Sequence, residues 1–218
     1  MKMKSVLVIG MGRFGRHLAE QMQQLGNNVM VVDVHEENIQ PYADTFTDSQ
    51  IGDCTNETVV KALGVDGFDI CFVTIGEDFE ASLIITSHLK NCGAKMVVAK
   101  ANQKIQADLL YKIGADEVVY PEREMAEKVA VRYAAKNIFD YVPLTAEYSI
   151  YEIPILPQWC GRTIMDLNVR RKYRLNIVAV KNEKVLSPMP GPDYMFVEGD
   201  HVVVMGKAED VFKIAAKA

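Results

Sequence analysis

The sequence predicts an α/β protein with a Rossmann-like, doubly wound parallel sheet, followed by a small C-terminal α+β domain. Two observations lead to this fold class. Short apolar runs alternate with amphipathic stretches up to about residue 136, and a glycine-rich motif stands where the first run passes into the first amphipathic stretch. Strands that alternate with helices indicate right-handed crossovers between parallel strands.

Four of the six predicted strands of the first domain, residues 5–10, 28–33, 69–76 and 94–100, are almost continuously apolar, which is typical of strands buried on both faces of a sheet. Residues 45–52 and 117–120 fit two further strands. The helices that cover the sheet are expected at residues 14–25, 57–63, 79–91 and 104–113.

A further helix is expected over residues 122–136, with an apolar stripe formed by Met125, Val129 and Tyr133. This stripe either packs on its own domain or forms a subunit interface, because exposed apolar patches usually mark partners.

The pattern changes after about residue 145. Residues 148–155 alternate, 161–173 are amphipathic, 175–181 and 200–206 are strand-like, 187–193 form a rigid loop, and 208–218 form a closing helix. We therefore expect a first, α/β domain at 1–136, a connecting segment at 137–146 and a small domain at 147–218. The small domain is near the lower size limit for independent stability, so dimerisation is expected to support it.

Composition limits the possible functions. The 218 residues include 24 Lys+Arg and 29 Asp+Glu, which gives a net charge of -5 and argues against a nucleic-acid partner. The longest apolar runs are strand-sized, so the chain is expected not to cross a membrane. The four cysteines share no CxxC spacing and the four histidines are scattered. We therefore expect reduced thiols and no metal site made of His and Cys.

The glycine motif, Gly10-Met11-Gly12-Arg13-Phe14-Gly15, follows the first strand and opens the first helix, and Val32-Asp33 ends the second strand. This context indicates an adenine nucleotide on a Rossmann sheet. Gly10 permits the tight turn, Gly12 lets the backbone approach the phosphates, and Gly15 allows close helix packing. Asp33 is expected to accept ribose hydroxyls and to repel a 2′-phosphate, which disfavours NADP.

Arg13 is a cation in the first turn of a predicted helix, where it opposes the helix dipole. It is either a solvated side chain or a phosphate contact in its own or a neighbouring subunit. Other candidates follow the strand ends, where doubly wound sheets place ligands. They are Asp53, Cys54, Ile75, Gly76, Glu77, Lys100 and Asn102. Each of them either contacts the nucleotide or has a role only within its own loop.

Segments along essentially the whole chain resemble a known family: GMGRFG, GDCTNE, TIGEDFEAS, IGADEVVYPEREMA, NIFDYVPLTAEYSIYEI and FVEGDHVVVMG. They are similar to the gating subunits of bacterial potassium transporters, the KtrA branch of the KtrA/TrkA family. In that family a nucleotide-binding RCK domain precedes a TrkA-C domain. The resemblance implies a homodimer that assembles into a homo-octameric ring in the cytoplasm, peripheral at the inner face of the cell membrane. It also implies a membrane potassium channel subunit of the KtrB or TrkH type as partner, with ATP favouring the conducting ring and ADP the closed one.

The resemblance also implies roles for individual residues. By position, it places Arg13 at the γ-phosphate across the dimer, Asp33 at the ribose, Asp53 and Cys54 at the adenine, Lys100 at the phosphates or a neighbouring loop, and Gln106 at a further polar contact. Glu122 matches a carboxylate near the γ-phosphate. Such an acid makes physical sense only with a bridging cation such as Mg²⁺ or Na⁺. Alternatively, Glu122 is a first-turn acid that stabilises its own helix.

Relatives bind cyclic di-AMP at the dimer seam of the small domain. The residues in comparable places are Ile164, Met165, Arg170, Asn176, Pro190 and Pro192. Alternatively, Ile164 and Met165 belong to the core, and Arg170 belongs to a solvated basic face.

Three functions are compatible with the sequence. A ligand-switched regulatory subunit without enzyme activity is favoured. A TrkA-type sensor of NAD and NADH would use the same Asp33. An NAD-dependent oxidoreductase would need a substrate-converting domain, and only about 70 residues remain after the first domain. No His-Asp or Lys-Tyr pair in the sequence is placed so as to indicate a catalytic acid or base.

Overall fold

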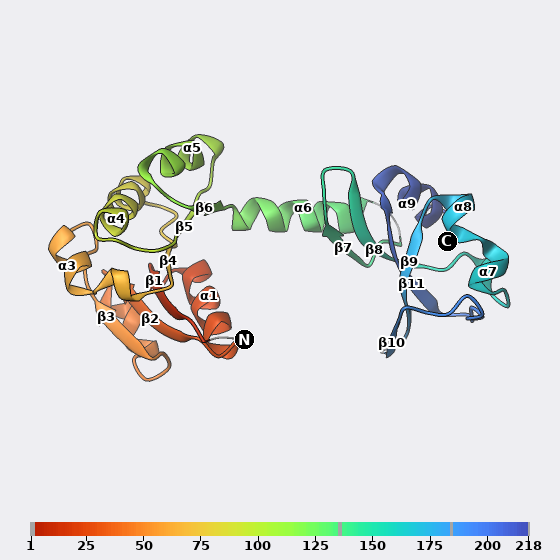
Figure 1. Ribbon diagram of the computed structural model, residues 1–218, viewed down its shortest axis with the longest axis horizontal. Coiled ribbons are helices and arrows are strands. Elements are labelled where there is room, and N and C mark those ends of the chain that lie inside the picture. Colours follow the sequence, from red (N-terminus) through yellow and green to blue (C-terminus); the bar gives the residue numbers. More distant parts are fainter. Residues whose placement is uncertain (1–2, 135–136, 184, 218) are drawn as a thin grey trace. The chain divides into compact units, whose positions relative to one another are not determined.

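The structure is a computed structural model that describes residues 3–134, 137–183 and 185–217. It contains two compact units, Met1–Arg123 and Glu124–Ala218 (Figure 1). The helix predicted over residues 122–136 is α6 (Pro121–Ala134), which begins in the first unit and continues into the second. The last two residues of that prediction lie outside the described residues, as does the last residue of the predicted closing helix. No described helix combines the length and the apolar character needed to cross a membrane.

The first unit contains a parallel sheet with the strand order β3-β2-β1-β4-β5-β6. Its strands are β1 (Ser5–Ile9), β2 (Asn28–Asp33), β3 (Asp48–Ile51), β4 (Ile70–Val73), β5 (Val97–Lys100) and β6 (Glu117–Val119). Its helices are α1 (Arg13–Gln24), α2 (Glu36–Ile39), α3 (Glu57–Ala62), α4 (Phe79–Asn91) and α5 (Lys104–Ile113), with short 3₁₀ turns η1 (Gln40–Tyr42) and η2 (Val65–Gly67). The strand order reverses between β1 and β4, as in the Rossmann fold, and confirms the predicted fold class.

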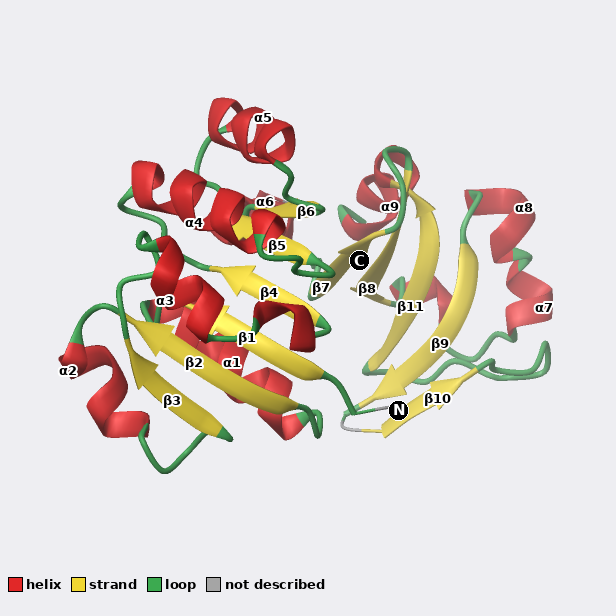
Figure 2. Cartoon of the chain, turned by 60° about the vertical axis from the view of Figure 1, so that its left-hand side comes forward, coloured by secondary structure: helices red, strands yellow, loops and turns green. Residues whose placement is uncertain are grey.

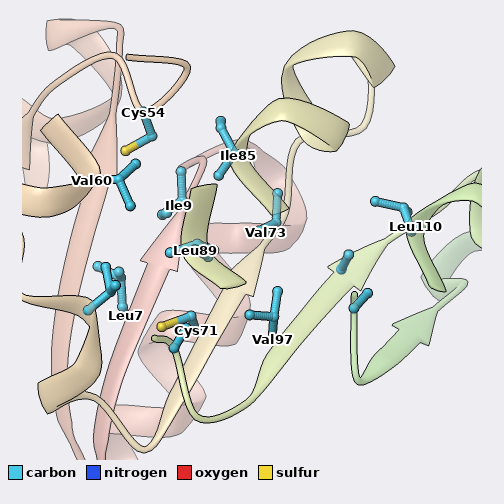
Figure 3. Packing of buried hydrophobic residues seen from close by; sticks show 14 of the residues in the cluster. Leu7, Ile9, Cys54, Val60, Cys71, Val73, Ile85, Leu89, Val97 and Leu110 are labelled. Carbon is cyan, nitrogen blue, oxygen red and sulfur yellow. The ribbon is translucent and has the colours of Figure 1, made fainter. Parts of the chain in front are cut away.

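Strand β1 shows why a continuous apolar run produces this fold. Leu7 and Ile9 belong to the core beneath α3, α4 and α5, whereas Val6 and Val8 belong to the core beneath α1. Figure 2 shows α4 and α1 on opposite faces of the sheet, and Figure 3 shows Leu7 and Ile9 near Leu89 of α4. Residues 6–9 are each at most 2% exposed. A strand covered on both faces needs apolar side chains at every position.

The second unit contains an antiparallel sheet with the strand order β10-β9-β11-β8-β7. Its strands are β7 (Asp140–Pro143), β8 (Tyr148–Pro154), β9 (Asn176–Asn182), β10 (Val185–Pro188) and β11 (Asp200–Lys207). Its other elements are the turn η3 (Pro157–Trp159) and the helices α7 (Ile164–Leu167), α8 (Val169–Tyr173) and α9 (Ala208–Ala215). The small α+β domain expected at residues 147–218 lies within this unit, which begins earlier, at Glu124.

Both edge strands of this sheet overlap segments for which the sequence predicts no strand. β7 falls within the expected connecting segment 137–146, and its Tyr141 pairs with Tyr151 of β8. β10 includes Ser187 and Pro188, which were assigned to the rigid loop 187–193. Proline is tolerated on an edge strand because that position needs no hydrogen bond to a further strand.

Helix α6 divides its apolar residues between the core of the second unit and its surface. Val131 packs against that core, whereas Met125, Val129 and Tyr133 are between 46% and 77% exposed. The predicted apolar stripe is therefore a surface feature of the chain.

Candidate functional site

A cavity of about 950 Å³ opens at the carboxyl ends of the parallel strands. Most of the predicted nucleotide contacts line it, namely Gly10, Gly12, Arg13, Phe14, Asp33, Asp53, Cys54, Ile75, Gly76, Glu77, Lys100, Asn102 and Glu122. Gly15, Val32 and Gln106 are not among the lining residues. The fold thus brings together side chains from loops that are far apart in the sequence, at the place where open α/β sheets bind ligands.

Several lining residues were missed by the sequence analysis. They include His35, Asn38, Thr74, Asp78 and Ala81. All of them lie in, or a few residues beyond, the loops that follow β2 and β4. Their position after two predicted strands indicates that they could lie near a ligand. The sequence pattern, however, does not show which residues of these loops face the cavity.

The glycine turn between β1 and α1 is closely packed on one side and open on the other. Gly10 has a φ of 99°, in the region that favours glycine. Its carbonyl oxygen accepts a hydrogen bond from the Thr74 hydroxyl at 2.5 Å. A Cβ atom on Gly15 would overlap that same carbonyl oxygen, whereas a Cβ on Gly12 would have no described neighbouring atom within 4 Å. A ligand can therefore approach the backbone at Gly12.

Gly12 is also the N-cap of α1, and no described side chain caps this helix end. The first N–H groups of a helix lack intrahelical partners, and the helix dipole is positive there. A phosphate is the type of ligand that satisfies both features.

Asp33 braces the glycine turn in addition to lining the cavity. Its Oδ2 accepts a hydrogen bond from the Met11 N–H at 2.6 Å, and its Oδ1 accepts one from the His35 N–H at 2.8 Å. The residue is 7% exposed. Each carboxylate oxygen can accept a second hydrogen bond, so the carboxylate keeps acceptor capacity for a ribose hydroxyl.

The wall formed by Asp53 and Cys54 combines a charged and an apolar group. Asp53 Oδ1 accepts hydrogen bonds from the Thr55 hydroxyl at 2.7 Å and the Thr55 N–H at 2.9 Å, and these bonds lower the pKa of Asp53. Burial raises the pKa of the Cys54 thiol to about 11, and the charges of Asp53 and Asp33 act in the same direction. Cys54 is therefore a neutral, apolar surface suited to a base.

Lys100 and Glu122 form an ion pair at the cavity wall, with 2.6 Å between Lys100 Nζ and Glu122 Oε1. The hydrogen bond from Lys100 lowers the pKa of Glu122, and the charge of Arg13 contributes in the same direction. Gly76 leaves room for the ammonium group, because a Cβ there would lie 2.9 Å from Lys100 Nζ. Asn102 Nδ2 donates a hydrogen bond to the Gly76 carbonyl oxygen at 2.7 Å and links the two loops.

Gln106 acts on the cavity through the start of α5. Its Oε1 accepts hydrogen bonds from the Asn102 N–H at 2.8 Å and the Gln103 N–H at 3.1 Å. Gln106 and Gln103 form a capping box. The structure therefore places Gln106 as a support for Asn102.

Glu122 was also the candidate cation ligand. Within residues 3–134, 137–183 and 185–217, no group of three or more His, Cys, Asp or Glu side chains is arranged to hold a metal ion. Glu122 pairs with the Lys100 ammonium. Ligand phosphate oxygens would have to supply most of the coordination of any cation at this carboxylate.

The residues predicted for cyclic di-AMP lie in the second unit. The Met165 N–H donates a hydrogen bond to the Pro192 carbonyl oxygen at 2.9 Å, which joins the start of α7 to the proline loop. Met165 is 68% exposed, whereas Ile164 packs against the core. Arg170 lies on α8, Asn176 begins β9, and Pro190 lies in the loop after β10.

Two domain families match the chain, and one match falls in each of its two compact units. The TrkA-N domain matches residues 6–121, and the TrkA-C domain matches residues 149–217. The chain belongs to the TrkA-N/TrkA-C family. This confirms the resemblance found in the sequence.

Relatives of this TrkA-N/TrkA-C chain include two Ktr proteins of Bacillus subtilis (strain 168). The chain is 37% identical over 208 residues to Ktr system potassium uptake protein C, covering 95% of this chain and 94% of that protein. It is 34% identical over 210 residues to Ktr system potassium uptake protein A, covering 96% and 95%. Among solved structures, the GsuK channel bound to NAD matches with a TM-score of 0.66 at 17% identity, over 99% of this chain and 39% of that one. The chain thus spans well under half of that channel's chain, and this likeness shows the fold.

Proposed function

We propose that this chain is a nucleotide-switched regulatory subunit of a potassium uptake system, without enzyme activity of its own. The observation that carries the proposal is the cavity at the glycine turn, which joins a helix N-terminus, the cations Arg13 and Lys100, and the carboxylate of Asp33 in one site. The relationship to Ktr system potassium uptake proteins supports a role in potassium transport over an NAD-dependent oxidoreductase.

The proposed ligands are ATP and ADP. Arg13 and Lys100 line the same cavity as the open backbone of Gly12, which suits a polyphosphate. Asp33 and Cys54 provide a ribose acceptor and an apolar surface for adenine. NAD and NADH are the alternative pair, because the adenosine half of a dinucleotide would use the same residues.

The proposed partner is a membrane potassium channel subunit of the KtrB or TrkH type. In this proposal the chain forms homodimers that assemble into a homo-octameric ring in the cytoplasm, peripheral at the inner face of the membrane. The exposed stripe of Met125, Val129 and Tyr133 on α6 supports a subunit interface, since exposed apolar patches mark such surfaces.

Two further ligands belong to this proposal as predictions. Mg²⁺ or Na⁺ would bind between Glu122 and the terminal phosphate, with phosphate oxygens completing its coordination. Cyclic di-AMP would bind in the second unit, where the backbone contact between Met165 and Pro192 brings part of the predicted site together.

Switching requires that ATP and ADP bind the two ring states with different affinity, because a ligand with equal affinity for both states shifts neither. Arg13 is the residue proposed to make this difference. A charge-assisted contact with the γ-phosphate is worth about 1.5 to 3 kcal/mol, which exceeds a tenfold change in affinity.

Arg13→Ala is expected to reduce the ratio of ATP affinity to ADP affinity about tenfold, with a smaller loss of ADP affinity. Isothermal titration calorimetry of the nucleotide-stripped protein measures both affinities. Arg16→Ala is the matched control, because Arg16 lies on the same helix and donates to the Tyr42 hydroxyl at 3.2 Å. An equal loss of affinity for ATP and ADP in Arg13→Ala would contradict the proposed mechanism.

A further inference from the structure

The loop after β3 and helix α4 both line the cavity at the glycine turn. The loop contributes Asp53, Cys54 and Thr55, and α4 contributes Ala81 and Ile85. Cys54 and Ile85 also belong to the same core of the first unit (Figure 3). The surface that we propose for the adenine base, at Cys54, is therefore packed in one core with α4.

A histidine on α4 joins these two elements. His88 Nε2 lies 3.1 Å from the Thr55 carbonyl oxygen, in a partly buried contact. A carbonyl oxygen only accepts hydrogen bonds, so Nε2 carries a proton and is the donor. His88 itself is not among the residues that line the cavity. It acts on the cavity through Thr55 and is therefore a positioning residue.

The residue that His88 holds also orients the carboxylate of Asp53. The Thr55 hydroxyl and the Thr55 N–H donate to Asp53 Oδ1, at 2.7 Å and 2.9 Å. At the start of the loop, the Gly52 N–H donates to the Asp33 carbonyl oxygen at 3.0 Å. The hydrogen bond from His88 thus fixes the middle of a loop whose start is anchored on β2.

An ionised carboxylate beside the base distinguishes adenine from guanine. The hydrogen bonds from Thr55 lower the pKa of Asp53, so its carboxylate is a charged acceptor at neutral pH. Adenine presents an amino group, which donates, where guanine presents a carbonyl oxygen, which only accepts. A carboxylate held at that edge attracts adenine and repels guanine.

We propose that His88 determines the base selectivity of the cavity, because it holds the loop that directs Asp53 to the amino group of adenine. This inference rests on the proposed binding of adenine nucleotides and deepens it by naming what selects the base. Without the donor on α4, the Thr55 carbonyl oxygen loses its partner, and the loop can turn the carboxylate away from the base. ATP then loses its advantage over GTP.

His88→Leu is expected to lower the affinity for ATP and for adenosine about fivefold, and to leave the affinity for GTP and for inorganic triphosphate unchanged. Calorimetric titration of the full chain with these four ligands measures the changes. His88→Gln is expected to retain the selectivity, because the glutamine amide nitrogen reaches the position of the histidine Nε2. His88→Asn is expected to behave like His88→Leu, because its amide group lies closer to the backbone.

His17→Leu is the matched control for the loss of a histidine. His17 lies on α1, where its Nδ1 is 3.4 Å from Glu20 Oε2 and its side chain is 79% exposed. It is not among the lining residues, so all four affinities are expected to stay unchanged.

The possible failures are distinguishable. A ratio of ATP affinity to GTP affinity that His88→Leu leaves unchanged would overturn the role of His88, and an equal loss for all four ligands would overturn it in favour of a general structural role. If His88→Leu does not fold, equal ratios in His88→Gln and His88→Asn would overturn it. Failure of the unmodified chain to bind ATP or ADP would instead overturn the proposed ligands themselves.

Discussion

Gly15→Ala is expected to destabilise the first unit by about 3 kcal/mol or more, whereas Gly12→Ala is expected to leave the fold intact and abolish nucleotide binding. A Cβ added at Gly15 would overlap the Gly10 carbonyl oxygen and lie 2.6 Å from Thr74 Oγ1. Those two atoms are hydrogen-bonded to each other, so neither can move without a cost. Denaturant unfolding followed by far-UV circular dichroism measures the difference.

The comparison with Gly12 separates packing from ligand binding. Gly12 has a φ of −62°, which alanine adopts readily, and a Cβ there meets open space among the described residues. The added methyl group would occupy the path by which a phosphate approaches the backbone. Equal stability losses in the two variants, or normal ATP affinity in Gly12→Ala, would contradict this account of the glycine turn.

Asp33→Asn is expected to cost about 2 kcal/mol of stability and to weaken adenine nucleotide binding at least tenfold. Both carboxylate oxygens accept backbone N–H groups, from Met11 and from His35. An asparagine offers only one oxygen, so its amide group would face the second N–H. The buried donor left unsatisfied is the physical source of the loss. Thermal unfolding and ATP titration measure the two effects.

Asp53→Asn provides the matched control, because it removes the same charge from the same cavity. Both of its hydrogen bonds from Thr55 reach one oxygen, Oδ1, and asparagine can retain that acceptor. Its stability is expected to stay within about 0.5 kcal/mol of the unmodified chain. A loss as large as that of Asp33→Asn would show that charge, and not the brace on the glycine turn, governs stability here.

Sequence patterns predict the central strands of the first unit well because both faces of these strands are covered. Leu7 and Val8 point to different cores, yet both must be apolar, so the run is continuous and easy to recognise. Edge strands lack this requirement. All four residues of β10 are exposed, and Pro188 interrupts the usual strand signal. For that reason the loop predicted at residues 187–193 includes Ser187 and Pro188, the last two residues of β10.

The candidate site was likewise predicted only in part from the sequence. The glycine motif and the loops after the strands indicate where a ligand would bind, and most of those residues line the cavity. The brace from Asp33 to the Met11 N–H depends on how one loop folds against another, which no local spacing reveals. The Lys100–Glu122 pair likewise joins residues from β5 and α6 that are far apart in the sequence, so no local spacing reveals it.

The most direct test of the proposed function is calorimetric titration of the nucleotide-stripped chain with ATP, ADP, NADH and cyclic di-AMP. ATP and ADP are expected to bind saturably at the glycine turn of the unmodified chain, and this binding is expected to be lost in Gly12→Ala. Binding of NADH without binding of ATP or ADP would contradict the assigned ligands. Turnover of a nicotinamide cofactor with any substrate would contradict a regulatory subunit.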